Sequence, residues 1–472
     1  MKFKLLLAMI LLPLLNSCTV GPNYKKPSSH TSKKWLSSQD TKAVIDVTQS
    51  VQTRWWQAFN DSTLTGLIQT ALKQNLDIKI AEAKIKEARA LRGGTVSGFY
   101  PKINGNVAAG REKISENSGI PVGAGIPINR DYYNAGFDAS WELDIFGGLH
   151  RSVESADAHL VASVESKHDV LLSLLSEISR NYMNVRGTQR RLEIARRNIV
   201  LQGRIVEIIR QRYHAGNTNE LELAKAEAQL HETQAVLPNL IADLRSYAYR
   251  LAILLAQEPQ TLLKQLLQDK PLPVPPDIIP VGLQSDILRR RPDIRRAERL
   301  LAAETADIGV ATAELFPKFS LTGNAGLQSL SFGNLFQSGS TAWALGPLIQ
   351  WPIFHGGEIH ARIKVEEVQA AAAALNYEKA VLGALEDTQT ALVRYGEEFE
   401  TRKRLSKVVV ANQKSLNLAE QRYKLGEDNI ISVFDITSKL LRAEDNLARS
   451  QTRTLINLIS LYKALGGGWE VF

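Results

Sequence analysis

The chain has 472 residues, with 57 lysines and arginines against 49 aspartates and glutamates, and its only cysteine is Cys18. The formal net charge of +8 is mild for this length and does not indicate a nucleic-acid partner. A single cysteine excludes an intramolecular disulfide, so packing or assembly has to hold the folded chain together.

Residues 1–17 are typical of a secretory signal peptide. Lys2 and Lys4 precede an apolar run that ends at Leu15 and is too short to cross a bilayer as a helix. The end of this run and the Asn-Ser-Cys that follows resemble the bacterial lipobox, in which the cysteine thiol receives a diacylglyceryl group. We therefore expect cleavage before Cys18 and attachment of lipid to it.

Residues 18–56 are polar and rich in turn-forming residues, which predicts a tether between the lipid and the folded body. Thr19 favours the outer membrane, because retention at the inner membrane usually goes with aspartate at this position. No later stretch contains 18 consecutive apolar residues, so no transmembrane helix is expected after the signal peptide. Any crossing of a membrane must then be made by β-strands.

The body of the chain is a tandem repeat. A shift of 216 residues matches Leu67, Asp77, Ala81 and Pro101 with Leu283, Asp293, Ala297 and Pro317, and a shift of 210 matches Trp141, Tyr213 and Gly216 with Trp351, Tyr423 and Gly426. Each copy reads as a helix, two strands and a long helical hairpin. We expect repeat 1 at residues 57–258, a proline-rich linker at 259–281, repeat 2 at 282–469 and a short tail at 470–472.

Residues 133–145 alternate between apolar and polar positions with the period of a β-strand. One face is expected to carry Tyr133, Ala135, Phe137, Ala139, Trp141, Leu143 and Ile145, and the other Asn134, Asp138, Ser140, Glu142 and Asp144. Residues 102–109 and 319–328 alternate in the same way, and a fourth strand is expected around Trp343 to Trp351. An ordinary half-buried sheet would show the same pattern.

Four strands are too few to close a membrane barrel, because the smallest such barrels have about eight. An open sheet edge is not tolerated in lipid, so strands embedded in a membrane would have to be pooled from several chains. Three chains would supply about twelve strands, within the usual range for such barrels.

A long helix is expected after each strand pair. The stretches from Gly148 to Tyr213 and from Gly357 to Tyr423 contain no proline, and each could form a helix of about 100 Å at 1.5 Å per residue. The returning segments carry apolar residues spaced alternately by three and four, beginning Leu223, Ala226, Leu230 and Val433, Ile436, Leu440. This heptad seam predicts paired antiparallel coiled-coil helices, with a local kink at Pro238.

Glycine and asparagine mark the turn of each hairpin. Gly216 and Gly426 stand just past the end of the outgoing helix, and Asn219 and Asn429 are expected to cap the returning one. Glu222 would complete a capping box with Asn219 in the first hairpin.

Several motifs together carry a family resemblance. They lie at Cys18 to Pro27, Trp55-Trp56, Leu288 to Ile294, Gly346-Pro347, Pro352 to Phe354 with Gly356-Gly357, and Ala464 to Trp469. With them the chain resembles the TolC-like outer-membrane factors, specifically the NodT/OprM-like lipoprotein branch that serves RND-type efflux systems. The resemblance implies an α+β membrane protein, a tandem-duplicated protomer of a trimeric twelve-stranded β-barrel continuous with a long periplasmic α-helical coiled-coil barrel.

The resemblance also implies a function and its partners. The protein would be the outer-membrane channel of a tripartite RND-type efflux pump, lipid-anchored in the outer membrane and conducting substrates passively. Its partners would be two further copies in a homotrimer, outer-membrane lipid, a periplasmic adaptor (membrane fusion) protein and an inner-membrane RND transporter. The adaptor would dock at the hairpin turns, around Gly216, Asn219, Gly426 and Asn429. The exit duct of a type I protein secretion system is the alternative.

The second hairpin carries a candidate gate. The resemblance matches Asp435 to an aspartate that constricts the closed periplasmic mouth, and Ile431 to an apolar constriction one turn earlier. The counterpart of Asp435 in repeat 1 is Lys225, and Ser438 stands where the family often has arginine. An ordinary solvated acid near the helix start is the alternative.

No arrangement in the sequence indicates catalysis. No Ser/His/Asp or Cys/His set is evident, so we expect no enzyme activity, no cofactor and no metal site. Arg289, Arg290 and Arg291 are interpreted as a solvated helix end before Pro292.

Overall fold

The computed structural model describes residues 19–27, 45–46, 49, 52–115, 129–276, 278–282 and 284–471. The expected signal peptide and Cys18 lie outside these residues. The chain forms two compact units. The first unit comprises residues up to Pro27, Ile85–Ser163 and Ala297–Tyr377, and the second comprises Ser28–Lys84, Val164–Arg296 and Glu378–Phe472.

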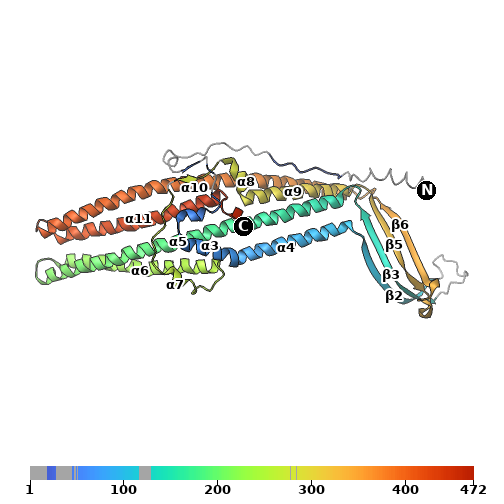
Figure 1. Cartoon of the computed structure of the whole chain (residues 1–472), viewed down its shortest axis with the longest axis horizontal. Helices are drawn as coiled ribbons and strands as arrows, with labels where there is room; N and C mark the ends of the chain where they lie inside the picture. Colours follow the sequence, from blue (N-terminus) through green and yellow to red (C-terminus); the bar gives the residue numbers. More distant parts are fainter. Residues whose placement is uncertain are drawn as a thin grey trace. The chain divides into compact units, whose positions relative to one another are not determined.

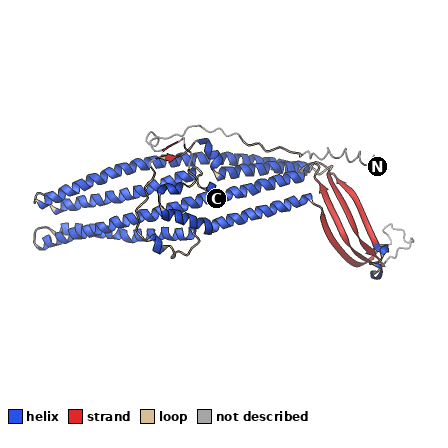
Figure 2. Cartoon of the chain, viewed as in Figure 1, coloured by secondary structure: helices blue, strands red, loops and turns tan. Residues whose placement is uncertain are grey.

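The first unit contains a four-stranded antiparallel sheet (Figure 2). Its strands, in the order in which they pair, are β2 (Lys102–Lys113), β3 (Asn129–Leu143), β5 (Lys318–Ser329) and β6 (Thr341–Gln350). All four strands predicted from the sequence are therefore present. The predicted end of the second at residue 145 was too late: Asp144 leaves the strand because its carboxylate accepts hydrogen bonds from the first amides of helix α5 (Gly148–His214).

The two faces of this sheet differ in chemistry. The register places Phe137 beside Ala325, which in turn pairs with Trp343, and all three stand on the face expected to be apolar. On this face Val107, Phe137 and Trp343 are exposed, at 86%, 66% and 75%. The sheet therefore presents bare apolar side chains over one face, and each of its outer strands, β2 and β6, has a single partner.

Helices of the first unit pack around small residues. The unit includes parts of α4 (Leu76–Val96), α5, α9 (Pro292–Ala313) and α10 (Glu358–Lys424), with the short elements η3 (Ser97–Phe99), η5 (Phe332–Asn334) and η6 (Ser338–Ser340). Its helical core contains Ala158, Ala302 and Ala303, with Tyr24 packed against them. The N-terminal residues contact this core through Tyr24.

Two long hairpins dominate the second unit (Figure 1). Helix α5 is followed by α6 (Glu220–Leu254), and α10 by α11 (Ile430–Ala464). Both α5 and α10 have 67 residues, which confirms the prediction of two helices of about 100 Å. Helix α6 continues through Pro238. Of the described helices, none is both long and apolar enough to cross a membrane.

The predicted heptad seams are the buried stripes of α6 and α11. Leu240 and Leu251 are buried in α6, as are Leu440 and Leu461 in α11. Smaller elements complete the unit: β1 (Ile45–Asp46) paired with β4 (Ile279–Pro280), η2 (Trp55–Phe59), α3 (Ser62–Gln74), α7 (Leu263–Leu266), η4 (Gln284–Asp286), α8 (Ile287–Arg290) and η7 (Trp469–Val471). The segment expected as a plain linker thus contains α7 and β4.

Trp55, in an early segment of the second unit, contacts residues close to the C-terminal end of the chain. Its fully buried indole stacks on Tyr462 with 5.1 Å between ring centroids, and its Nε1–H donates to the Gly467 carbonyl at 3.1 Å. A Cβ on Gly468 would lie 2.9 Å from this nitrogen, so only glycine fits there. Two of the sequence motifs, Trp-Trp and Gly-Gly-Gly-Trp, therefore form a single contact.

Candidate functional site

The two hairpin turns share one backbone geometry and lie at the same end of the second unit (Figure 1). Gly216 has φ +72° and Gly426 has φ +74°, in the left-handed region that favours glycine. The Gly216 N–H donates to the Tyr213 carbonyl at 2.9 Å, and the Gly426 N–H to the Tyr423 carbonyl at 3.0 Å. Each glycine therefore ends its long helix and reverses the chain, as the sequence predicted.

Asparagine begins both returning helices. The Asn219 Oδ1 accepts from the Glu222 N–H at 3.0 Å, and the Asn429 Oδ1 accepts from the Ile431 N–H at 3.4 Å. The predicted capping role of both residues is confirmed. The Glu222 carboxylate contacts the Lys225 ammonium at 3.4 Å, so it serves a side-chain ion pair.

Asp428 gives the second turn a fixed negative charge that sequence reasoning missed. Its Oδ1 accepts from the Ser432 hydroxyl and from the Asn429 N–H, both at 2.8 Å. These two hydrogen bonds, the one from Ser432 first, lower the pKa of the Asp428 carboxyl. The first turn has Thr218 at the matching position, so a comparison of the two repeats would have singled Asp428 out.

The predicted gate residues lie on α11 just inside the second turn. Asp435 is exposed, whereas its neighbours Val433 and Phe434 are buried in an apolar cluster built from both hairpins. Ile431 is half-buried and packs against the same cluster. In the described part of the chain, the buried Ser438 hydroxyl has no hydrogen-bond partner, so it gives Asp435 no support. The two predicted gate residues therefore have different surroundings. Ile431 packs on the apolar cluster and anchors α11, whereas Asp435 is exposed.

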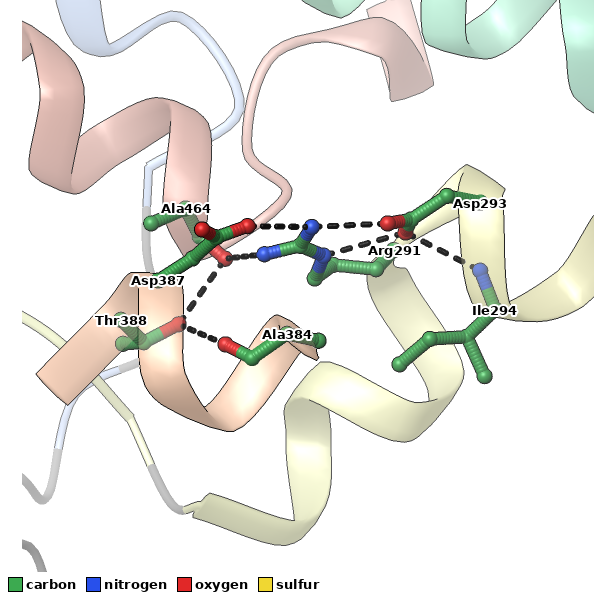
Figure 3. Close-up of polar contacts among 7 residues, drawn as sticks. All are labelled: Arg291, Asp293, Ile294, Ala384, Asp387, Thr388 and Ala464. Atoms are coloured by element: carbon green, nitrogen blue, oxygen red, sulfur yellow. Dashed lines mark hydrogen bonds and ion pairs between the residues drawn. The ribbon is translucent and has the colours of Figure 1, made fainter. Parts of the chain in front are cut away.

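Arg291 is buried, so its interpretation as part of a solvated helix end was wrong. Figure 3 shows its guanidinium between α9, α10 and α11. Nη2 lies 2.7 Å from Asp293 Oδ2 and 3.0 Å from Asp387 Oδ2, and Nη1 donates to the Ala464 carbonyl at 3.3 Å. The Thr388 hydroxyl donates to the same carbonyl at 3.1 Å. One side chain thus joins three helices of the second unit.

The charge of Arg291 is maintained by its partners. Burial is the largest single influence and lowers the pKa of the guanidinium, but hydrogen bonds and attraction from Asp293 and Asp387 outweigh it. The net result is a pKa raised above the ordinary value for arginine. Arg291 is therefore a permanently charged bridge within the unit.

Residues 19–27, which we call the N-terminal strap, are fixed to the first unit. The Arg151 guanidinium is almost fully buried and donates to the Val20 carbonyl at 3.1 Å and to Asn23 Oδ1 at 2.7 Å. Further along the strap, the Lys26 ammonium lies 2.9 Å from Glu298. A Cβ on Gly147, which has φ +76°, would lie 2.7 Å from the Thr19 Cα. The first residue of the strap, Thr19, therefore lies beside the loop between β3 and α5.

Comparison with known proteins agrees with this architecture. A family model described as outer membrane efflux protein matches residues 67–257 and 283–467. The solvent efflux pump outer membrane protein SrpC of Pseudomonas putida is 30% identical over 479 residues, covering 100% of this chain and 99% of the relative. Nodulation protein T of Rhizobium leguminosarum bv. trifolii is 31% identical, covering 97% and 96%.

Solved structures show the same fold. The outer-membrane channel OprN superposes with a TM-score of 0.89 at 34% identity, covering 96% of this chain and 100% of that one. The open state of the Neisseria gonorrhoeae MtrE outer membrane channel gives a TM-score of 0.81 at 28% identity, covering 96% and 99%. The family and the channel function expected from the sequence are confirmed. The chain belongs to the outer membrane efflux protein family, and it is an outer-membrane efflux channel, not an enzyme.

Proposed function

We propose that three copies of this chain assemble into one channel, which serves as the outer-membrane component of a tripartite RND-type efflux pump and conducts substrates passively. The observation that carries the proposal is the sheet of the first unit, with four strands, two open edges and an exposed apolar face. Open edges are not tolerated in lipid, and membrane barrels have about eight strands or more. Pooling the strands of three chains gives about twelve and leaves no edge unpaired.

An exposed stripe on α10 supports assembly with further copies. Val365, Val368, Leu375 and Leu382 are all exposed and follow a heptad spacing along this helix. An exposed stripe with this spacing is typical of the contact face of a coiled-coil helix whose partner helix is absent from the single chain. A neighbouring copy that covers it would extend the helices of each chain into the α-helical barrel expected from the sequence.

The two halves of the chain support a tandem duplication at the proposed boundaries, 57–258 and 282–469 with 259–281 between them. Helices α6 and α11 both have 35 residues, and the family model matches each half separately. In one half the Trp141 indole donates to the Phe99 carbonyl at 2.8 Å, and in the other Trp351 donates to Leu315 at 3.2 Å. The duplication places two hairpin turns from every chain at one end of the channel.

We infer that this end is where a periplasmic adaptor docks and couples the channel to an inner-membrane RND transporter. Gly216, Asn219, Gly426 and Asn429 are all exposed at the turns. Leu425, beside the second glycine, is exposed as well. In a trimer, three copies of the exposed Asp435 would surround the axis just inside this mouth, with Ile431 one turn nearer the tip.

The trimer can be tested directly. Native mass spectrometry of the protein extracted in detergent is expected to show a mass of three chains, because a single chain cannot close its sheet. The matched comparison is the same sample after heat denaturation, which should show one chain. A folded, stable monomer as the main species would contradict the proposal.

We also propose that Cys18 carries the lipid anchor. The strap supports this, because Thr19, the residue that follows Cys18, packs beside Gly147 in the first unit. Cys18→Ala is expected to abolish incorporation of a labelled fatty acid and to loosen membrane association only in part, since the strands also hold the protein in the membrane. Ser17→Ala is the control and should keep its label. Unchanged labelling of Cys18→Ala would exclude lipidation at this residue.

A further inference from the structure

A row of side chains crosses the polar face of the sheet at mid-strand. The register aligns Asn104 of β2, Asp138 of β3 and Asn324 of β5. Asp138 is half-buried, and its Oδ2 accepts from the Asn104 amide at 3.0 Å while its Oδ1 accepts from the Asn106 amide. The carboxylate is therefore held beside β2 by two donors that carry no charge of their own.

The other ionised residues on this face stand near the two ends of the strands. Towards the sheet's far end Glu112 and Arg130 form an ion pair, and at the helical end Lys102 pairs in register with Ser140, next to Glu142 on the same face. Lys318 begins β5 at the same helical end, where it pairs in register with Gln350 of β6. Among the ionised residues on this face of the described strands, Asp138 alone stands at mid-strand, in a row whose other members are the uncharged Asn104, Asn324 and Ala344.

We propose that Asp138 makes the strand region of the channel selective for cations, as a second charged ring separate from Asp435. The inference rests on the proposed trimer: with apolar side chains on the outer face, the polar face lines the aqueous passage, and three Asp138 carboxylates lie in one layer. A ring of carboxylates favours cations and repels anions. The partner chemistry is thus a small hydrated cation, or the cationic group of a larger substrate.

The expected effect depends on salt in a way that locates the charge. The screening length is about 30 Å at 0.01 M salt and about 3 Å at 1 M. Because a channel of about twelve strands is wide, Asp138 acts across it only at low salt. The preference for cations should therefore be strong in dilute salt and vanish in concentrated salt.

The test compares Asp138→Asn with Asp131→Asn in planar bilayers under a potassium chloride gradient. Asp131 lies on the same strand but on the opposite face, where it pairs with Arg111 at 3.6 Å, so it is a matched control. Both variants are made in the Asp435→Ala background, which removes the other proposed ring. At about 0.01 M salt, Asp138→Asn should lower the ratio of cation to anion permeability about twofold or more, and at 1 M it should change nothing. Asp131→Asn should have the same permeability ratio as its parent at both salt concentrations.

The outcomes separate this inference from the trimer on which it rests. If the parent protein is not trimeric by native mass spectrometry, the proposed function fails. If trimeric channels conduct and Asp138→Asn keeps the permeability ratio of its parent, or Asp131→Asn lowers it equally, the Asp138 ring is wrong and the trimer stands.

A second variant covers the case in which the asparagine disturbs the strand. Asp138→Cys can be treated with thiol reagents that add either a negative or a positive group, and the only other cysteine is Cys18. The negative reagent should restore the cation preference and the positive one should reverse it. Equal effects of the two reagents on the permeability ratio would overturn the inference.

Discussion

Replacing Asp435 with alanine is expected to raise the resting conductance of the channel several-fold and to lower its preference for cations. Asp435 is exposed on α11 beside the anchored residues Val433 and Phe434, so the substitution leaves the apolar cluster intact. In the proposed trimer, three such carboxylates ring the narrow mouth, where water and ions must pass close to each of them. Removing them widens the constriction and removes its charge together. Single-channel recordings in planar bilayers measure both.

Lys225→Ala is the matched control, because Lys225 occupies the equivalent position in the first hairpin. Its ammonium is already paired with Glu222, so its loss should leave conductance and selectivity near those of the parent protein. Conductance and selectivity of Asp435→Ala identical to the parent would make Asp435 an ordinary surface acid. The Asp138 and Asp435 variants should also differ in kind, since only the latter changes the size of the opening.

Arg291→Ala is expected to destabilise the second unit by about 3 kcal/mol per chain, the low end of the range for breaking a buried ion pair. The low end applies because the Asp387 side chain is 62% exposed and can be rehydrated. The Ala464 carbonyl keeps its bond from Thr388, but α9 loses its link to α10 and α11. Thermal unfolding followed by circular dichroism, at fixed protein concentration, measures the loss.

Two further variants give this prediction its controls. Arg289→Ala changes an exposed arginine two residues earlier and should shift stability by no more than about 0.5 kcal/mol. Arg291→Lys keeps the charge but loses the planar guanidinium that reaches Asp293, Asp387 and Ala464. Its stability should therefore lie between that of the parent protein and that of Arg291→Ala. Equal melting temperatures of Arg291→Ala and Arg289→Ala would show that the contacts of the Arg291 guanidinium add nothing to stability.

Local periodicity explains why the elements were predictable. The alternation around Phe137 and the heptad spacing from Leu223 and Val433 are properties of neighbouring residues, and they gave the strands and both hairpins. The hairpin turns were predictable for the same reason, because Gly216 and Gly426 supply a left-handed residue where the long helices end. Strand limits were less accurate, since the end of β3 is set by the capping of α5 by Asp144.

What could not be predicted depends on partners far away in the chain. Arg291 finds its carboxylate on Asp387, 96 residues later, and its carbonyl on Ala464, 173 residues later. Nothing in the run of three arginines tells which one is buried. The mid-strand position of Asp138, in a row of uncharged residues, likewise appears only when the register of β2, β3 and β5 is known.

If Cys18 is cleaved and lipidated as proposed, the N-terminal strap imposes an order on the maturation of the protein. Thr19 packs against Gly147, and Arg151 donates to Val20 and Asn23, so the strap is fixed to the first unit from Thr19 onward. A peptidase needs several residues on each side of its cleavage site to be extended and accessible. Under the proposed lipidation, acylation and removal of the leader come before the strap docks, and a chain that folded first would be trapped as an uncut precursor. Under that proposal, the buried Arg151 binds the strap only after processing.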